Sequence, residues 1–291
     1  MRFLNFSLIL SLACACEINT GKSVAANQTD EDSYAEAVKI RSNDTIKLSS
    51  KATLRLSDSA KVEQIIYKMI DSLGLKNSLR SNYKRSFLDT THESIQLISL
   101  YWGHIFNKKK SHIYAKIEYD GIVYYHIYLF ENNALIRQVY EQFLTIEAPK
   151  DTIDDINRDG INDFSINFYG SCGCCLKNHY VIYLYNDEKN QFADKFDLLN
   201  PTFYRNEGIV RGIGYGQPGE TEITTCKWNN FSLDTLEMIT QDRDERGELT
   251  GKYVQYIYTD YRKGIYKEKI IKQVPVVYKS MRDYFWFLGE L

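Results

Sequence analysis

The run His112-Ile-Tyr-Ala-Lys-Ile-Glu-Tyr119-Asp-Gly-Ile122-Val-Tyr-Tyr-His-Ile-Tyr-Leu-Phe130 decides the fold of this chain. From Ser111 onward the side chains alternate in character with a period of two, which is the period of a β-strand. Asp120-Gly121 is a typical hairpin turn, and residues 122–130 return as a second strand rich in tyrosine. We therefore expect an antiparallel hairpin here and assign residues 111–291 to an antiparallel β domain.

Further strand candidates follow the hairpin, and they share short apolar or alternating runs bounded by Gly, Asn and Asp. They lie at 135–146, 163–169, 179–185, 209–215, 222–228, 231–239, 253–261 and 265–271. The chain holds 23 Tyr and 14 Phe but only 4 Pro, a composition that favours sheets. The pattern predicts an antiparallel sheet or sandwich, with a short helix at 280–288.

Residues 60–73 form the one clear helical segment. Its apolar side chains recur at helical spacing on one face, at Val62, Ile65, Ile66, Met69, Ile70 and Leu73. Ser59 is a suitable N-cap and Gly74 a suitable C-terminal stop. We predict an amphipathic helix packed on the sheet, so the fold class is mainly β and α+β overall. We assign 59–110 to a helical N-terminal part, which either joins the β domain or forms its own cap.

The N-terminus has the features of an export signal. Arg2 precedes an apolar stretch, residues 3–13, that is shorter than the roughly 20 residues needed to cross a bilayer. The small residues that follow lead into Cys14 and Cys16, and both contexts resemble a bacterial lipobox. We predict a lipoprotein-type signal peptide at 1–16, with either cysteine lipidated, and a polar, flexible tether at 17–58. Plain secretion is the alternative.

Charge and motifs argue against several functional classes. The net charge of −2 gives no basic face, so we expect no nucleic-acid partner. The chain contains no Gly-x-Ser-x-Gly or His-Glu-x-x-His, and the glycine-rich run 212–216 lacks the helix that a phosphate loop needs. His112 and His126 lie on paired strand candidates, where packing across the hairpin is the simplest role. We do not expect an enzyme.

The most specific motif is Asp155-Ile-Asn157-Arg-Asp159-Gly160-Ile161-Asn-Asp163, with oxygen side chains at loop positions 1, 3, 5 and 9 and glycine at 6. Oxygen ligands at this spacing wrap around Ca²⁺. An EF-hand places a bidentate Glu at position 12, where this chain has Ile166, so Asp151, Asp154 or water would complete the site. The loop also leads into a strand and not a helix. We predict a structural Ca²⁺ site with ligands Asp155, Asn157, Asp159, Ile161 (carbonyl) and Asp163. An acidic turn without metal is the alternative.

Four cysteines remain after the signal: Cys172, Cys174, Cys175 and Cys226. In an oxidising compartment they indicate disulfides, and we expect one of the first three to pair with Cys226. A thiolate metal cluster is the alternative, although the spacing lacks two separated Cys-x-x-Cys pairs.

Several segments together resemble a family of exported Gram-negative β proteins: 155–164, 169–178, 180–186, 200–203 and 226–229. The resemblance covers about 113–236, and the calcium loop is its most specific part. Some members are similar in fold to periplasmic lysozyme inhibitors, and some act as immunity proteins against peptidoglycan-degrading effectors. The resemblance implies that Gly170, Ser171 and Gly173 belong to a loop that plugs a hydrolase cleft, although the intervening cysteines depart from the family pattern.

We therefore expect a calcium-stabilised binding module, a periplasmic or outer-membrane lipoprotein of the cell envelope. Its expected partners are the membrane, through the lipid anchor, and a peptidoglycan hydrolase. The alternatives are a surface adhesion or glycan-binding module, suggested by the Tyr- and Trp-rich sheet, and a hydrolase.

Overall fold

A computed structural model describes residues 58–74, 83–87, 95–170 and 175–290, all of which belong to one compact unit, Arg55–Leu291. The predicted signal peptide with Cys14 and Cys16 lies outside the described residues, as does the predicted tether up to residue 57. Among the residues described, no helix is long and apolar enough to span a membrane.

The described unit consists mainly of antiparallel strands, as predicted. The N-terminal sheet contains, in order, β1 (Tyr83–Phe87), β2 (Ile95–Gly103), β3 (Ser111–Tyr119), β4 (Ile122–Glu131) and β5 (Ala134–Leu144). The middle sheet contains β11 (Phe196–Leu199), β8 (Asn178–Tyr183), β7 (Asp163–Tyr169) and β6 (Lys150–Asp154), and a small ribbon pairs β9 (Tyr185–Asn186) with β10 (Gln191–Phe192). The C-terminal sheet contains β12 (Pro201–Tyr204), β13 (Ile209–Ile213), β14 (Ile223–Asn229), β15 (Ser232–Arg243), β16 (Leu249–Asp260) and β17 (Ile265–Ile271).

Helical structure is limited in the described residues. The α-helices are α2 (Asp58–Ser72) and α4 (Tyr284–Leu288). Single 3₁₀ turns are η1 (Thr145–Glu147), η2 (Arg205–Glu207) and η3 (Val276–Tyr278). The strand predicted at 135–146 therefore stops at Leu144, and the helix predicted at 280–288 is confined to α4.

The hairpin predicted from 112–130 is confirmed. β3 and β4 pair from Ser111 opposite Phe130 to Tyr119 opposite Ile122. Asp120 and Gly121 have φ of 50° and 76°, the left-handed conformation that a two-residue turn between strands of this twist requires.

Both faces of the N-terminal sheet are buried. On one face, Ile98, Leu100 and Ile113 share a hydrophobic cluster with Val62, Ile66 and Ile70 of α2. On the opposite face, Tyr114, Tyr125 and Phe143 share a cluster with Phe164, Ile166 and Val181 of the middle sheet. Each such side chain contributes about 1.5–3 kcal/mol on burial, so the two faces hold this sheet in place.

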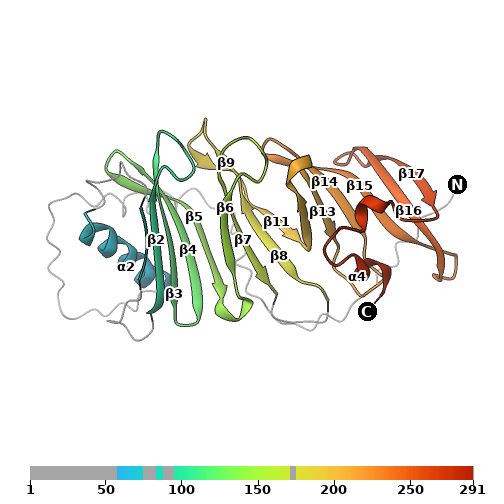
Figure 1. Cartoon of the computed structure of the whole chain (residues 1–291), viewed down its shortest axis with the longest axis horizontal. Helices are drawn as coiled ribbons and strands as arrows, with labels where there is room; N and C mark the ends of the chain where they lie inside the picture. The colour runs from blue at the N-terminus through green and yellow to red at the C-terminus, as the bar shows by residue number, and fades with distance from the viewer. Residues whose placement is uncertain (1–57, 75–82, 88–94, 171–174, 291) are drawn as a thin grey trace, which may run out of the picture. The chain divides into compact units, whose positions relative to one another are not determined.

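Apolar side chains also join the middle sheet to the C-terminal sheet, and the C-terminal sheet to the C-terminal segment. Ile182 of the middle sheet packs with Val210 and Trp228 of the C-terminal sheet. The other face of the C-terminal sheet meets the C-terminal segment, where Ile223 and Ile239 pack with Val274, Tyr278, Met281 and Phe287. The three sheets are therefore stacked in the order N-terminal, middle and C-terminal, which can be followed from left to right in Figure 1, and the C-terminal segment with α4 packs on a face of the C-terminal sheet.

One prediction about the N-terminal part was wrong. We assigned 59–110 to a helical part, but α2 ends at Ser72 and the next described segments are the strands β1 and β2. β2 pairs with β3 from Ile95 opposite Tyr119 to Gly103 opposite His112, so it belongs to the N-terminal sheet. Ile98, Leu100 and Trp102 are buried on alternate positions, a period of two that the sequence analysis overlooked.

Candidate functional site

The predicted calcium loop is the connection between β6 and β7. The two strands form their last pair at Asp154 and Asp163, and the loop occupies the residues between them. Ile156 is buried with the cluster between the middle and C-terminal sheets, and Ile161 packs against the cluster between the N-terminal and middle sheets. Apolar side chains at two positions therefore anchor the loop to different layers.

Asp155 folds the loop around its own carboxylate. Oδ1 accepts hydrogen bonds from the backbone N–H groups of Arg158 (2.7 Å) and Asp159 (3.2 Å), and Oδ2 accepts one from Gly160 (3.0 Å). This tight turn places Arg158 and Gly160 at φ of 68° and 85°. Glycine adopts such left-handed angles without strain, so the predicted role of Gly160 in the sharp turn is confirmed.

Asn157 and Asp159 continue the same pattern. Asp159 Oδ1 accepts the backbone N–H of Ile161 (2.9 Å), and Asp159 Oδ2 accepts the Asn157 side-chain amide (3.0 Å). Asn157 Oδ1 in turn accepts the backbone N–H of Asp159 (3.3 Å). The side-chain oxygens of Asp155, Asn157 and Asp159 thus all accept hydrogen bonds from backbone N–H groups between residues 158 and 161. Each ionised carboxylate offers about four acceptor sites, so oxygen lone pairs remain for a cation.

Asp163 differs from the other loop carboxylates because it is fully buried. Its Oδ2 accepts the backbone N–H of Ile156 and its Oδ1 accepts that of Tyr185, both at 2.9 Å. Burial raises the pKa of Asp163 to about 7; the hydrogen bonds from Tyr185 and Ile156 oppose the rise, and the charge of Asp159 adds to it. This carboxyl group ties the loop to β9 through the start of β7.

Polar side chains of the loop reach all three large sheets or their connections. The Asn162 side-chain amide donates to the carbonyl of Ile105, just after β2 (2.9 Å). The Asn157 amide donates to the carbonyl of Asn230, in the turn between β14 and β15 (3.1 Å), and Arg158 donates to the carbonyl of Asn206 in η2 (2.8 Å). The loop is therefore a junction where the N-terminal, middle and C-terminal sheets are linked.

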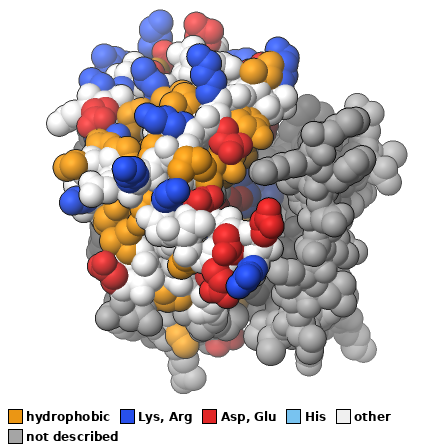
Figure 2. Space-filling view, turned by 90° about the vertical axis from the view of Figure 1, so that its right-hand side faces the viewer, with side chains coloured by type: hydrophobic (Ala, Val, Ile, Leu, Met, Phe, Trp, Pro, Cys, Tyr) orange, Lys and Arg blue, Asp and Glu red, His pale blue; other side chains and the backbone are white. Residues whose placement is uncertain are grey.

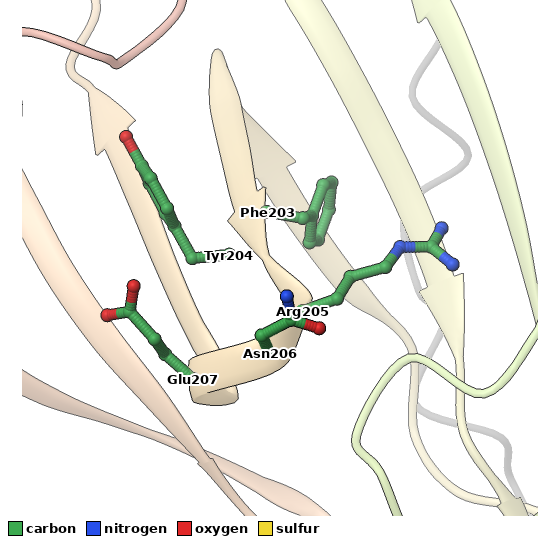
Figure 3. Close-up of a pocket in the computed structure, with 5 residues that line it drawn as sticks. All are labelled: Phe203, Tyr204, Arg205, Asn206 and Glu207. Atoms are coloured by element: carbon green, nitrogen blue, oxygen red, sulfur yellow. The ribbon is translucent and has the colours of Figure 1, made fainter.

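A shallow depression lies on the C-terminal-sheet side of this junction, lined by Phe203, Tyr204, Arg205, Asn206 and Glu207 (Figure 3). Arg205 points away from Tyr204 and Glu207 and forms an ion pair with Asp154, the residue before the loop. This feature was not predicted from the sequence, because η2 is a single turn with no motif of its own.

No disulfide is seen among the described residues, but Cys172 and Cys174, two of the three predicted partners of Cys226, lie outside them, so the predicted pairing stays a prediction. Cys226 lies inside the C-terminal sheet, opposite Val210 of β13 and Thr235 of β15, and its Sγ is 3.6 Å from the Thr235 hydroxyl. These strands surround the thiol, and its burial raises its pKa. Cys175 is buried.

The predicted inhibitory loop is described only in part. Gly170 directly follows β7, and its backbone N–H donates to the carbonyl of Lys177 (2.9 Å), which closes the connection toward β8. Ser171, Cys172, Gly173 and Cys174 lie outside the described residues.

The two histidines of the hairpin do not meet. His112 is opposite Leu129 and His126 is opposite Ala115 in the register of β3 and β4. His112 contacts Phe106 and Tyr185, while His126 contacts Tyr128 and Tyr140 on the opposite face. Within the described ranges, no group of three or more His, Cys, Asp or Glu side chains is arranged to hold a metal ion. The predicted calcium loop includes an amide and a backbone carbonyl in addition to its carboxylates.

Comparisons of the chain with protein-family models, with curated proteins and with solved structures found no match. The chemistry of the loop and of the exposed surfaces therefore has to carry the functional proposal.

Proposed function

We propose that this chain is an exported, lipid-anchored binding protein whose β unit is stabilised by Ca²⁺ in the loop between β6 and β7. The ligands are Asp155, Asn157, Asp159, the carbonyl of Ile161, and Asp163. The observation that carries the proposal is the junction itself: one oxygen-rich loop is hydrogen-bonded to segments of three sheets.

The chemistry of the loop suits a hard cation. Three carboxylates lie between residues 155 and 163, and the charge of Asp159 opposes the ionised form of Asp163. A divalent cation reverses this repulsion, and Ca²⁺ accepts six to eight oxygen ligands in flexible geometry. Of the groups expected to stand in for the missing Glu, Asp151 is engaged by Tyr114 and Lys116, at 2.7 and 2.9 Å, and Asp154 is paired with Arg205. Water therefore completes the coordination, which fits the weak sites of ~10⁻⁴–10⁻³ M found in extracellular proteins.

The predicted helix on the sheet is part of the same proposal. The burial of Val62, Ile66 and Ile70 with Ile98 and Leu100 supports it. With α2 on one side and the calcium loop at the junction of the sheets, the unit forms a rigid scaffold for binding.

Calcium is expected to raise the thermal stability of the purified full-length chain. A ligand that binds only the native state stabilises it by about 2.7 kcal/mol when its concentration is a hundred times the dissociation constant. We expect the unfolding midpoint to rise with Ca²⁺ and fall with chelator, and Asp159→Ala to abolish the rise. Asp194→Ala, which removes an exposed carboxylate outside the loop, is the matched control. A midpoint indifferent to calcium in the wild-type chain would show that the loop is an acidic turn only.

The partner that we propose is a peptidoglycan hydrolase, on the strength of the family resemblance. We expect the full-length chain in Ca²⁺ to slow the digestion of purified Gram-negative peptidoglycan by a lysozyme or an effector muramidase. Ser171→Trp is expected to remove the inhibition without changing the unfolding midpoint, because it alters the plugging loop and not the scaffold. Equal digestion rates with and without the chain, across several such enzymes, would contradict the inhibitor role.

A glycan-binding module is the second candidate, favoured by a cluster of tyrosines on β16, on β17 and in the turn between them. Tyr261 and Tyr266 are 54% and 46% exposed, and the ring of Tyr258 lies 4.9 and 5.5 Å from theirs. Aromatic faces of this kind stack on sugar rings. A glycan array that shows binding by the wild-type chain but not by a Tyr261→Ala/Tyr266→Ala variant would favour this function over inhibition.

A further inference from the structure

β17 is an exposed edge strand of the C-terminal sheet. It pairs with β16 from Tyr253 opposite Ile271 to Asp260 opposite Ile265, and in the described part of the chain its other edge is hydrogen-bonded to no strand. Residues 265–270 are all exposed. Such an edge presents backbone N–H and C=O groups that can pair with a further strand.

The edge strands β5 and β6 of the other sheets have neighbours. Gln138 on β5 donates a hydrogen bond to the carbonyl of Asn190, next to β10 (3.0 Å). The end of β6 is held by the ion pair between Asp154 and Arg205. β17 has no comparable cover among the residues that the structure places, and it contains no proline that would block pairing.

The two faces of β17 differ in chemistry. Lys267 and Lys269 lie opposite Ile257 and Gln255 on one face, and neither lysine takes part in an ion pair within the described residues. Tyr266 and Ile270 lie on the other face, opposite Tyr258 and Val254, with Glu268 between them opposite Tyr256. The edge therefore offers a basic row, Lys267 and Lys269, on one side and, on the other, an apolar row, Tyr266 and Ile270, that Glu268 interrupts.

A second copy of this chain is a poor partner for the edge. Antiparallel pairing of two β17 strands about a two-fold axis keeps like faces together, so a residue lies opposite one of the same row. Pairing centred on Glu268 places Lys267 opposite Lys269 and Glu268 opposite Glu268. A shift by two residues in either direction places Lys267 or Lys269 opposite its own copy. Like charges directly opposite are destabilising, so the lysines oppose self-association.

We propose that the free edge of β17 binds an extended acidic segment of a partner protein by adding it as a seventh strand to the C-terminal sheet. Backbone hydrogen bonds supply the pairing, and acidic side chains at alternate positions meet Lys267 and Lys269. Figure 2 faces the side on which β16 and β17 lie in Figure 1, and it shows Lys and Arg side chains interspersed with hydrophobic and acidic ones.

The apolar row supplies the second half of the specificity. The ring of Tyr266 lies 5.3 Å from that of Tyr256 and 5.5 Å from that of Tyr258, which makes an aromatic surface beside the edge. Valine or isoleucine residues that alternate with the acidic ones in the added strand cover this surface. The ligand is thus a segment of alternating acidic and β-branched residues. The inference does not depend on the calcium loop, which belongs to a different connection.

The probe is a labelled peptide, Thr-Val-Glu-Val-Glu-Val-Thr, titrated with the full-length chain by fluorescence anisotropy. We expect binding that weakens at least tenfold between low and high salt, because the contacts to Lys267 and Lys269 are screened. The double variant Lys267→Glu/Lys269→Glu is expected to weaken it at least tenfold and to gain affinity for the peptide with Lys in place of Glu. Lys108→Glu/Lys109→Glu makes the same change in net charge at exposed residues away from β17. This control variant is expected to bind like the wild type.

Two peptides, one N-methylated at every Val and one at both Glu residues, separate strand addition from simple charge attraction, because the N–H groups of alternate residues point to opposite edges of a strand. Loss of binding by one of the two supports the proposal, and retention by both overturns it, because N-methyl groups remove the backbone donors and leave the charges. Equal binding of the acidic and basic peptides overturns it as well. The proposal is also overturned if sedimentation shows that the wild-type chain is a dimer and that Lys267→Glu/Lys269→Glu dissociates it. The edge of β17 would then pair with a second copy of the chain. Both reversals are at exposed positions, and an unchanged unfolding midpoint confirms that the variants are folded.

Discussion

Replacing Asp163 with alanine is expected to lower the free energy of unfolding by about 4 kcal/mol, a large part of the 5–15 kcal/mol typical of a folded protein. The carboxylate is the acceptor for the backbone N–H groups of Ile156 and Tyr185, and both residues are buried. Alanine leaves two buried donors without partners, each at a cost of about 1–3 kcal/mol. Urea unfolding in chelator measures this loss apart from any contribution of calcium.

Asparagine at the same position offers a graded control. Asp163→Asn keeps one acceptor oxygen and turns an NH₂ group toward the second N–H, so we expect a loss smaller than that of alanine. Asp194→Ala removes an exposed carboxylate and should change stability by less than about 0.5 kcal/mol. If Asp163→Ala were as mild as Asp194→Ala, Asp163 would have no structural role at the junction of the sheets.

Acidification from pH 7 to pH 5 is expected to cost about 4 kcal/mol of stability through His112 and His126 together. Burial lowers the pKa of His112 to about 4, with a smaller effect from the charge of His104. Burial lowers that of His126 to about 3, with a smaller effect from Arg137. The unfolded chain binds a proton at each histidine below about pH 6.5, whereas the folded chain does not until pH 4 or lower. Stability from these groups is therefore present at neutral pH and is lost as the pH falls through this window.

Other groups titrate in the same range, so the test compares variants. Asp163, whose folded pKa is raised, contributes with the opposite sign, and its contribution cancels when proteins are compared in one buffer. His112→Gln and His126→Gln keep a polar group near the hydroxyls of Tyr185 and Tyr128, which the histidines contact at 3.2 and 3.0 Å. Each variant is expected to lose about 2 kcal/mol less than the wild type between pH 7 and pH 5. An unchanged pH dependence in both variants would mean that neither imidazole stays neutral in the folded chain.

Local patterns in the sequence predicted the local structure well. The alternation in 112–130 and the pair Asp120-Gly121 are short-range signals, and they gave the β3–β4 hairpin with its register. The stacking of the sheets could not be predicted from the sequence, because both faces of these strands are buried. In β4, Val123 and Tyr125 face one cluster while Tyr124 and Tyr128 face another, so the buried residues run almost without interruption. Which apolar face meets which depends on contacts between distant segments.

The candidate site shows the same division. The spacing of Asp155, Asp159 and Gly160 located the loop and its sharp turn, because the turn is formed by hydrogen bonds between residues close together in the sequence. The burial of Asp163 and its bond to Tyr185 were not predicted, since they arise where β9 passes the end of β7. The surroundings of Cys226 were not predicted for a related reason: composition gives the number of thiols, whereas the register of β13, β14 and β15 shows which residues lie beside Cys226.

The position of the loop at the junction of three sheets has a consequence for how the chain folds. In the N-terminal and C-terminal sheets each strand pairs with its neighbours in sequence, so these parts can form through local contacts, which form rapidly. The bonds from the loop to Ile105, Asn206 and Asn230 join segments that are distant along the chain, and they close only after the separate meanders have docked. They are thus absent from an early transition state. Substitutions in the loop should leave the refolding rate nearly unchanged and increase the unfolding rate. The junction therefore determines the lifetime of the folded molecule and not the rate at which the chain folds.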